Sequence, residues 1–116
     1  MKIALPLDED RLSVCPAFGR APFFMVFDNE GKTTEIIDNP GAQAEGGAGL
    51  KAAQAVVDSG AEVRITPRCG ENAAEVFKAA GIAIYKTRGS SAADNFAGYE
   101  AGSLSCLHIS MPAITV

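Results

Sequence analysis

The order of apolar runs and turns in the 116-residue chain predicts an α/β domain with a mixed sheet. Three extended segments come first, two of them joined as a hairpin, and helical and extended segments then alternate. A hairpin is antiparallel, whereas strands joined through a helix favour parallel neighbours. The sheet should therefore combine both directions and carry helices on both faces. With 47% hydrophobic and 21% charged residues, the composition is typical of one globular domain.

Local patterns define the individual elements. Alternating or continuous short apolar runs bounded by turns predict strands over residues 2–7, 23–27, 32–37, 62–66 and 82–85. A first helix runs from about Leu50 to near Gly60, because its apolar residues recur at intervals of three and four. A second helix covers 71–80, and a third covers about 91–101, where Ser91 suits an N-cap. The tail 103–116 is compatible with an extra strand or a loose arm.

Charge and hydropathy exclude several classes of protein. The net charge is −4, from 14 acidic and 10 basic residues, and the basic residues are scattered, so the chain lacks the basic patch of a nucleic-acid binder. No apolar run approaches the roughly 20 residues that span a bilayer. We expect a cytoplasmic protein with no membrane contact. The cysteines are odd in number and widely spaced (Cys15, Cys69 and Cys106), which indicates reduced thiols rather than a disulfide framework.

Cys69 lies between a predicted strand and a predicted helix. Helix N-terminal amides and the neighbouring Arg68 would both favour its thiolate, the form that binds metals. Ligands of open α/β sheets lie beyond the carboxyl ends of the strands, and this loop is one of those ends. The alternative is a small residue packed under a turn.

Two further groups of residues could bind metal. Cys15 lies on the loop after the first strand, where a parallel sheet would bring it near Cys69, and two thiols could hold a soft metal or an iron–sulfur species. Cys106 and His108 are two residues apart, so in a strand they would share one face. A buried cysteine and a surface histidine are the alternative for this second pair.

The glycine-rich run 46–49 precedes the first predicted helix. Gly47, Gly49 and Ala52 fit a dinucleotide-binding pattern, but no strand comes directly before them, as that pattern requires. Amides at the positive end of a helix dipole nevertheless suit an anionic ligand. The acidic run 8–10 could hold Mg²⁺ for phosphoryl chemistry, or form a solvated loop.

Several motifs occur in a characteristic order. They are Met1-Lys2-Ile3-Ala4-Leu5-Pro6-Leu7-Asp8, Phe18-Gly19-Arg20-Ala21-Pro22-Phe23-Phe24, Asn39-Pro40, Gly46-Gly47-Ala48-Gly49 with Ala53-Gln54, and Cys69-Gly70-Glu71-Asn72-Ala73. Over residues 1–102 the chain thereby resembles the dinitrogenase iron–molybdenum cofactor biosynthesis family. The resemblance implies a ribonuclease-H-like α/β/α fold with a five-stranded mixed sheet. It also implies binding or delivery of an iron–molybdenum or iron–sulfur cofactor without catalysis.

One position departs from the family pattern. The family commonly has His directly before Phe-Gly-Arg, whereas this chain has Ala17. An imidazole ligand or orienting group is therefore missing, and Cys15, two residues earlier, is a candidate replacement. The tail 103–116 lies outside the resemblance.

We therefore predict a non-catalytic carrier of an anionic metal–sulfur cluster or its precursor, which exchanges this cargo with donor or acceptor proteins. Its predicted ligands are Cys15 and Cys69, with Arg20 and Arg68 offsetting cluster charge and the amides of residues 47–49 as donors. A partner-binding or regulatory module without a cofactor is the alternative. A metal-dependent, ribonuclease-H-like enzyme that uses the acidic run 8–10 is a remote third hypothesis.

Overall fold

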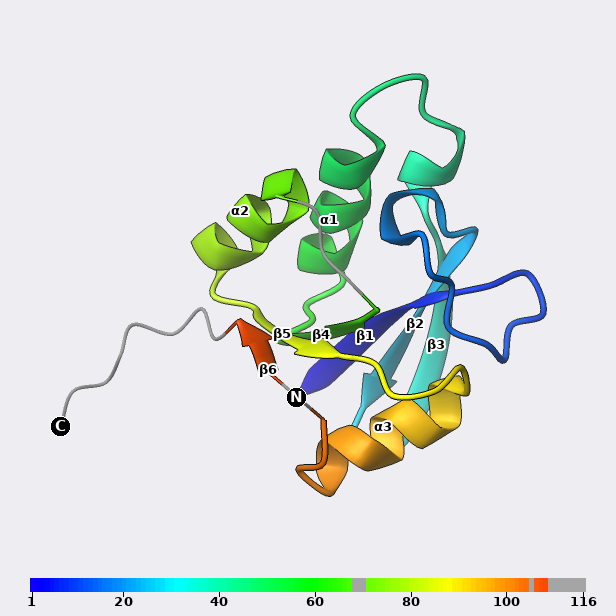
Figure 1. Cartoon of the computed structure of the whole chain (residues 1–116), viewed down its shortest axis with the longest axis vertical. Helices are drawn as coiled ribbons and strands as arrows, with labels where there is room; N and C mark the ends of the chain where they lie inside the picture. The colour runs from blue at the N-terminus through cyan, green and yellow to red at the C-terminus, as the bar shows by residue number, and fades with distance from the viewer. Residues whose placement is uncertain (68–70, 105, 109–116) are drawn as a thin grey trace, which may run out of the picture.

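The structure is a computed structural model that describes residues 1–67, 71–104 and 106–108. Its strands are β1 (Lys2–Leu7), β2 (Phe23–Asp28), β3 (Thr33–Asp38), β4 (Val63–Thr66), β5 (Ala83–Lys86) and β6 (Cys106–His108). Its helices are α1 (Ala48–Asp58), α2 (Glu71–Ala80) and α3 (Ala92–Glu100), with short 3-10 turns η1 (Phe18–Arg20) and η2 (Pro40–Gln43). Figure 1 shows α1 and α2 on one side of the sheet and α3 on the other. In the described ranges no helix has the length and apolar character needed to cross a membrane.

The sheet is mixed and has the strand order β3-β2-β1-β4-β5-β6. Strands β1, β2 and β3 form an antiparallel meander, and β4 and β5 continue the sheet parallel to β1. Strand β6 returns antiparallel to β5 at the far edge. The carboxyl ends of β1 and β4 consequently lie side by side at one edge of the sheet.

The central strand β1 is buried on both faces, so its sequence is continuously apolar rather than alternating. Ile3, Leu5 and Leu7 pack in the core beneath α3, where Phe96 contributes. Ala4 lies on the opposite face in the core with α1 and α2. This arrangement gives the protein two hydrophobic layers separated by the sheet.

The structure confirms the predicted α/β class, the mixed sheet and the helices on both faces. The five predicted strands and three predicted helices are present, with their ends shifted by up to two residues. The prediction of five strands needs one addition, because residues 106–108 of the tail form β6 as a sixth. Three tail residues can take this position because the edge of β5 offers unpaired backbone groups.

Candidate functional site

Two loop segments and the start of α1 meet at the edge where the parallel strands β1 and β4 end (Figure 1). The loop after β1 carries η1, the segment after β3 carries η2, and α1 begins a few residues further on. Both 3-10 turns pack against α1 and against each other. Ligands of open α/β sheets bind beyond the carboxyl ends of the strands, which makes this edge the candidate site.

The side chain of Asn39 fastens η1 to η2. It is 5% exposed, and its Nδ2 donates to the carbonyl oxygens of Ala21 at 2.8 Å and Gly19 at 3.2 Å. Its Oδ1 accepts a hydrogen bond of 2.8 Å from the backbone N–H of Gly41, which starts η2 as an Asx turn. One buried amide thus joins two backbone segments of the site through three hydrogen bonds.

Two glycines allow these segments to approach α1 backbone to backbone. A Cβ on Gly41 would lie 2.5 Å from the carbonyl oxygen of Ala48 and 2.9 Å from that of Gly19. A Cβ on Gly19 would lie 3.2 Å from the backbone nitrogen of Gly49. The first turn of α1 is therefore held against η1 and η2 by contacts that a larger residue would disrupt.

Arg20 ties η1 to the segment that enters α1. Its side chain is exposed, and Nη1 donates to the carbonyl oxygens of Gly41, Ala42 and Ala44. Arg20 thus holds the loop and also places a positive charge close to the N-terminus of α1.

The N-terminus of α1 is open. Its N-cap Gly47 has a φ of +67°, and no side chain among the described residues caps the helix or places an acid in its first turn. A Cβ at Gly47 or Gly49 would meet no described atom within 4 Å. The first amides of a helix lack intrahelical partners and lie at the positive end of the dipole, so this end can bind an anion.

Cys15 is a buried thiol at the same edge. It is 8% exposed, its backbone N–H donates to Pro6 at the end of β1 at 3.0 Å, and its Sγ donates to the carbonyl oxygen of Ala17 at 3.7 Å. Burial raises the pKa of the Cys15 thiol, and the negative charge of Asp8 adds to this rise, against the opposing hydrogen bond. The resting form of Cys15 is therefore the thiol.

The remaining predicted ligands are placed only in part. Arg68 and Cys69 lie outside the described residues, directly after β4 and before α2. Cys106 and His108 form the ends of β6, two strands away from β4. At about 4.8 Å between strands, their backbone is roughly 10 Å from β4, on the outermost strand of the sheet. Cys106 pairs with Tyr85, near the carboxyl end of β5.

The acidic run after β1 has a structural role. The carboxylate of Asp10 accepts 2.8 Å hydrogen bonds from the backbone N–H groups of Leu12 and Ser13, and a 2.7 Å bond from the Ser13 hydroxyl. These bonds hold the pKa of Asp10 below its ordinary value. Among the residues that the structure describes, no three His, Cys, Asp or Glu side chains gather closely enough to hold a metal ion.

Sequence reasoning missed the role of Arg64 on β4. It is fully buried, with its guanidinium 3.3 Å from the ring centroid of Phe18 and 4.8 Å from that of Phe77. Its Nη2 also donates to Thr66 Oγ1 at 2.8 Å. A positive charge is thus fixed beneath the end of β4, next to η1. The sequence signal for this role was an arginine inside a short predicted strand that lies between two other strands of the sheet.

Comparison with known proteins identifies the family. A family model described as dinitrogenase iron-molybdenum cofactor matches residues 1–102. The chain belongs to this family. The protein MJ0580 of Methanocaldococcus jannaschii is 40% identical over 89 residues, which are 74% of each chain.

Solved structures of similar chains agree with this assignment. The apo form of the orange protein from Desulfovibrio gigas has a TM-score of 0.85 at 30% identity and covers 93% of each chain. The Thermotoga protein TM1290, solved as a candidate NifB protein, has a TM-score of 0.76 at 32% identity, with 91% of this chain and 92% of the other covered. In the present member of the family, Ala17 is exposed and is the N-cap residue of η1.

Proposed function

We propose that this chain binds an anionic metal–sulfur cluster, or a precursor of one, as cargo, and exchanges it with a donor or acceptor protein without catalysing a reaction. The observation that carries the proposal is the open N-terminus of α1, held between η1 and η2. Membership of a family named for the iron–molybdenum cofactor supports this class of cargo. The orange protein structure, described as an apo form, implies a ligand for that relative.

Local positive potential explains how a chain of net charge −4 would attract an anion. Arg20 is bonded to the segment that enters α1, and Arg64 lies buried on β4 next to η1. A buried charge is screened by solvent less than an exposed one, so its field reaches further into the site. Together with the helix dipole, these two guanidinium groups supply the positive potential.

The two candidate cysteine ligands differ in what binding would require. Cys69 follows β4 and precedes α2, a position at which helix amides and Arg68 would favour the thiolate. Cys15 must lose a proton that burial retains, and its sulfur must also be uncovered. We therefore assign Cys69 as the first ligand and Cys15 as a ligand that joins when the loop after β1 opens.

The test is cluster loading under oxygen-free conditions. The purified chain is reconstituted with iron and sulfide, with and without molybdate, and its metal content, acid-labile sulfide and visible spectrum are measured. The proposal expects stoichiometric metal and sulfide, lost in Cys69→Ala and reduced in Cys15→Ala. Cys106→Ala is the matched control, because β6 is two strands away from β4, and should load as the wild type does.

Two outcomes would contradict the proposal. A colourless, metal-free wild-type protein with an intact fold would favour the module that binds a partner without a cofactor. Turnover of a phosphate ester with Mg²⁺ or Mn²⁺ would favour the enzyme hypothesis, although the carboxylate of Asp10 is already engaged by its own loop.

A further inference from the structure

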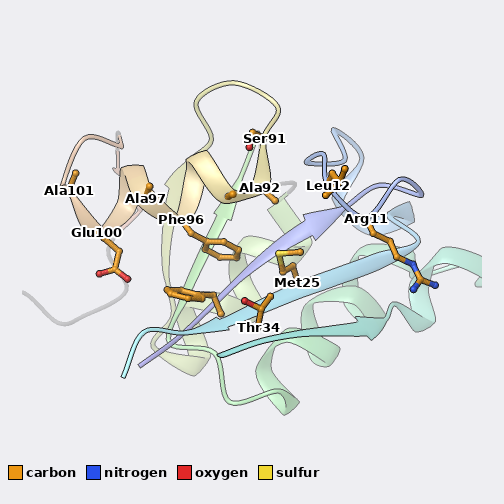
Figure 2. A pocket seen from close by; sticks show the side chains of 12 residues that line it. Arg11, Leu12, Met25, Thr34, Ser91, Ala92, Phe96, Ala97, Glu100 and Ala101 are labelled. Carbon is orange, nitrogen blue, oxygen red and sulfur yellow. The ribbon is translucent and has the colours of Figure 1, made fainter. Parts of the chain in front are cut away.

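The face of the sheet that carries α3 has an apolar groove beside the helix. The groove lies between α3 and strands β2 and β3 and has a cavity volume of about 940 Å³. Met25 from β2 and Phe96 from α3 line its apolar part (Figure 2). Phe27 from β2 also lines the groove. It lies on the opposite face of the sheet from α1, so it is separate from the candidate site described above.

A rigid loop presents an apolar side chain at the mouth of this groove. Leu12 is 73% exposed. Its backbone N–H donates to Asp10 at 2.8 Å, and its carbonyl oxygen accepts a 2.9 Å hydrogen bond from Ala92 at the start of α3. The loop therefore holds a large apolar side chain in water beside an apolar hollow, an arrangement typical of interaction surfaces.

Opposite charges stand at the two ends of the groove. Arg11 lies at one end and Glu100 at the other, with Met25 and Phe96 between them (Figure 2). Within the part of the chain that the structure describes, neither forms an ion pair, and they are the charged residues among those lining the groove. When two copies of the chain are related by a twofold axis through the centre of the groove, the positive end of each groove faces the negative end of the other.

We propose that this groove is the interface of a symmetric homodimer of the chain. Leu12 of each protomer enters the far end of the other protomer's groove, where Ala97 and Ala101 leave room for a leucine. Arg11 of each protomer meets Glu100 of the other. In a dimer with twofold symmetry, each contact between one residue and a second residue of the partner occurs twice, once in each direction. A groove with opposite charges at its two ends meets this requirement. The open end of α1 remains accessible in both protomers.

Sedimentation and light scattering of the full chain, from about 1 µM to 1 mM, test the proposal. The mass is expected to rise from 12.0 kDa towards twice that value. Leu12→Asp should weaken the dimer at least tenfold, whereas Leu50→Asp should leave it unchanged, because Leu50 is an exposed residue of α1 on the opposite face. Circular dichroism of each variant verifies that it is folded.

A charge exchange tests the pairing itself. Arg11→Asp and Glu100→Lys should each weaken the dimer, and the double variant should restore most of it. Asp suits position 11, where the backbone φ is +60°. A wild-type chain that stays monomeric throughout the range overturns the proposal, as does a dimer that is indifferent to Leu12→Asp. A monomer that binds a fluorescent apolar probe in the groove also overturns it and assigns the groove to a small apolar ligand.

Discussion

Replacing Asn39 by alanine should destabilise the protein by about 3 kcal/mol, because the amide makes three hydrogen bonds within the site. The bonds to Ala21 and from Gly41 are buried and contribute about 1–1.5 kcal/mol each. The bond to Gly19 is part-buried, where water can substitute, and contributes about 0.5 kcal/mol. For a chain of this length, the sum corresponds to a fall in melting temperature of roughly 10–12 °C.

Urea unfolding followed by circular dichroism measures the effect on the free energy of unfolding. Gln43→Ala is the matched control, since Gln43 is an exposed residue of the same 3-10 turn and should change the free energy by less than about 0.5 kcal/mol. If Asn39→Ala stays within about 0.5 kcal/mol of the wild type, the amide does not hold η1 to η2, and our description of the site is wrong.

Three further predictions concern the same edge of the sheet. Gly41→Ala should lower the free energy of unfolding by about 1–3 kcal/mol in urea titrations, because its Cβ would meet backbone oxygens, while Gly31→Ala has room and should not. Burial raises the pKa of the Cys15 thiol. The stabilisation that the protonated thiol contributes is therefore complete below the ordinary thiol pKa and is lost as the pH rises above it. The free energy of unfolding, measured between pH 7 and 10, should show this loss in the wild type but not in Cys15→Ala. Arg64→Met should weaken binding of the dianion tetrathiomolybdate, a metal–sulfur probe, about fifteenfold in a spectrophotometric titration, because one charge about 10 Å from a dianion at an effective dielectric of about 40 contributes about 1.7 kcal/mol. Arg64→Lys, which keeps the charge, should lose less affinity, and an equal loss in both variants would contradict an electrostatic role.

The elements that could be predicted from the sequence are those defined by local signals. The hairpin of β2 and β3 follows from two apolar runs and a polar turn, and α1 from apolar residues at helical spacing. Ser91 does cap α3, because its side chain accepts a hydrogen bond from the backbone N–H of Asp94. Such features depend on residues that are close together in the chain, so local sequence patterns predict them.

The features that could not be predicted depend on residues far apart in the chain. The sequence predicts only a break in regular structure at Asn39, before a proline. Its role in the site arises when folding brings Gly19 and Ala21 beside it. The sequence predicts that Cys15 is a loop thiol accessible to a metal, yet packing at the end of β1 buries it. Arg64 reads as one charge within a strand, and its position against two phenylalanine rings requires the sheet and α2 together.

A negative charge placed at the N-terminus of α1 should prevent an anion from binding there. The Cβ position of Gly49 is open, so Gly49→Glu and its neutral control Gly49→Gln should both fold. An acid in the first turn also stabilises a helix by about 0.3–1 kcal/mol, so the glutamate variant should be at least as stable as the control. A loss of cargo could then not be attributed to unfolding.

The measurement is the affinity of both variants for tetrathiomolybdate. At about 8 Å and an effective dielectric of about 40, a carboxylate repels each cargo charge by about 1 kcal/mol, which corresponds to roughly thirtyfold for a dianion. We expect Gly49→Glu to bind the probe about thirtyfold more weakly than Gly49→Gln, and we expect the difference to shrink as salt is added. Equal affinities in the two variants would show that the cargo does not bind at this end of α1.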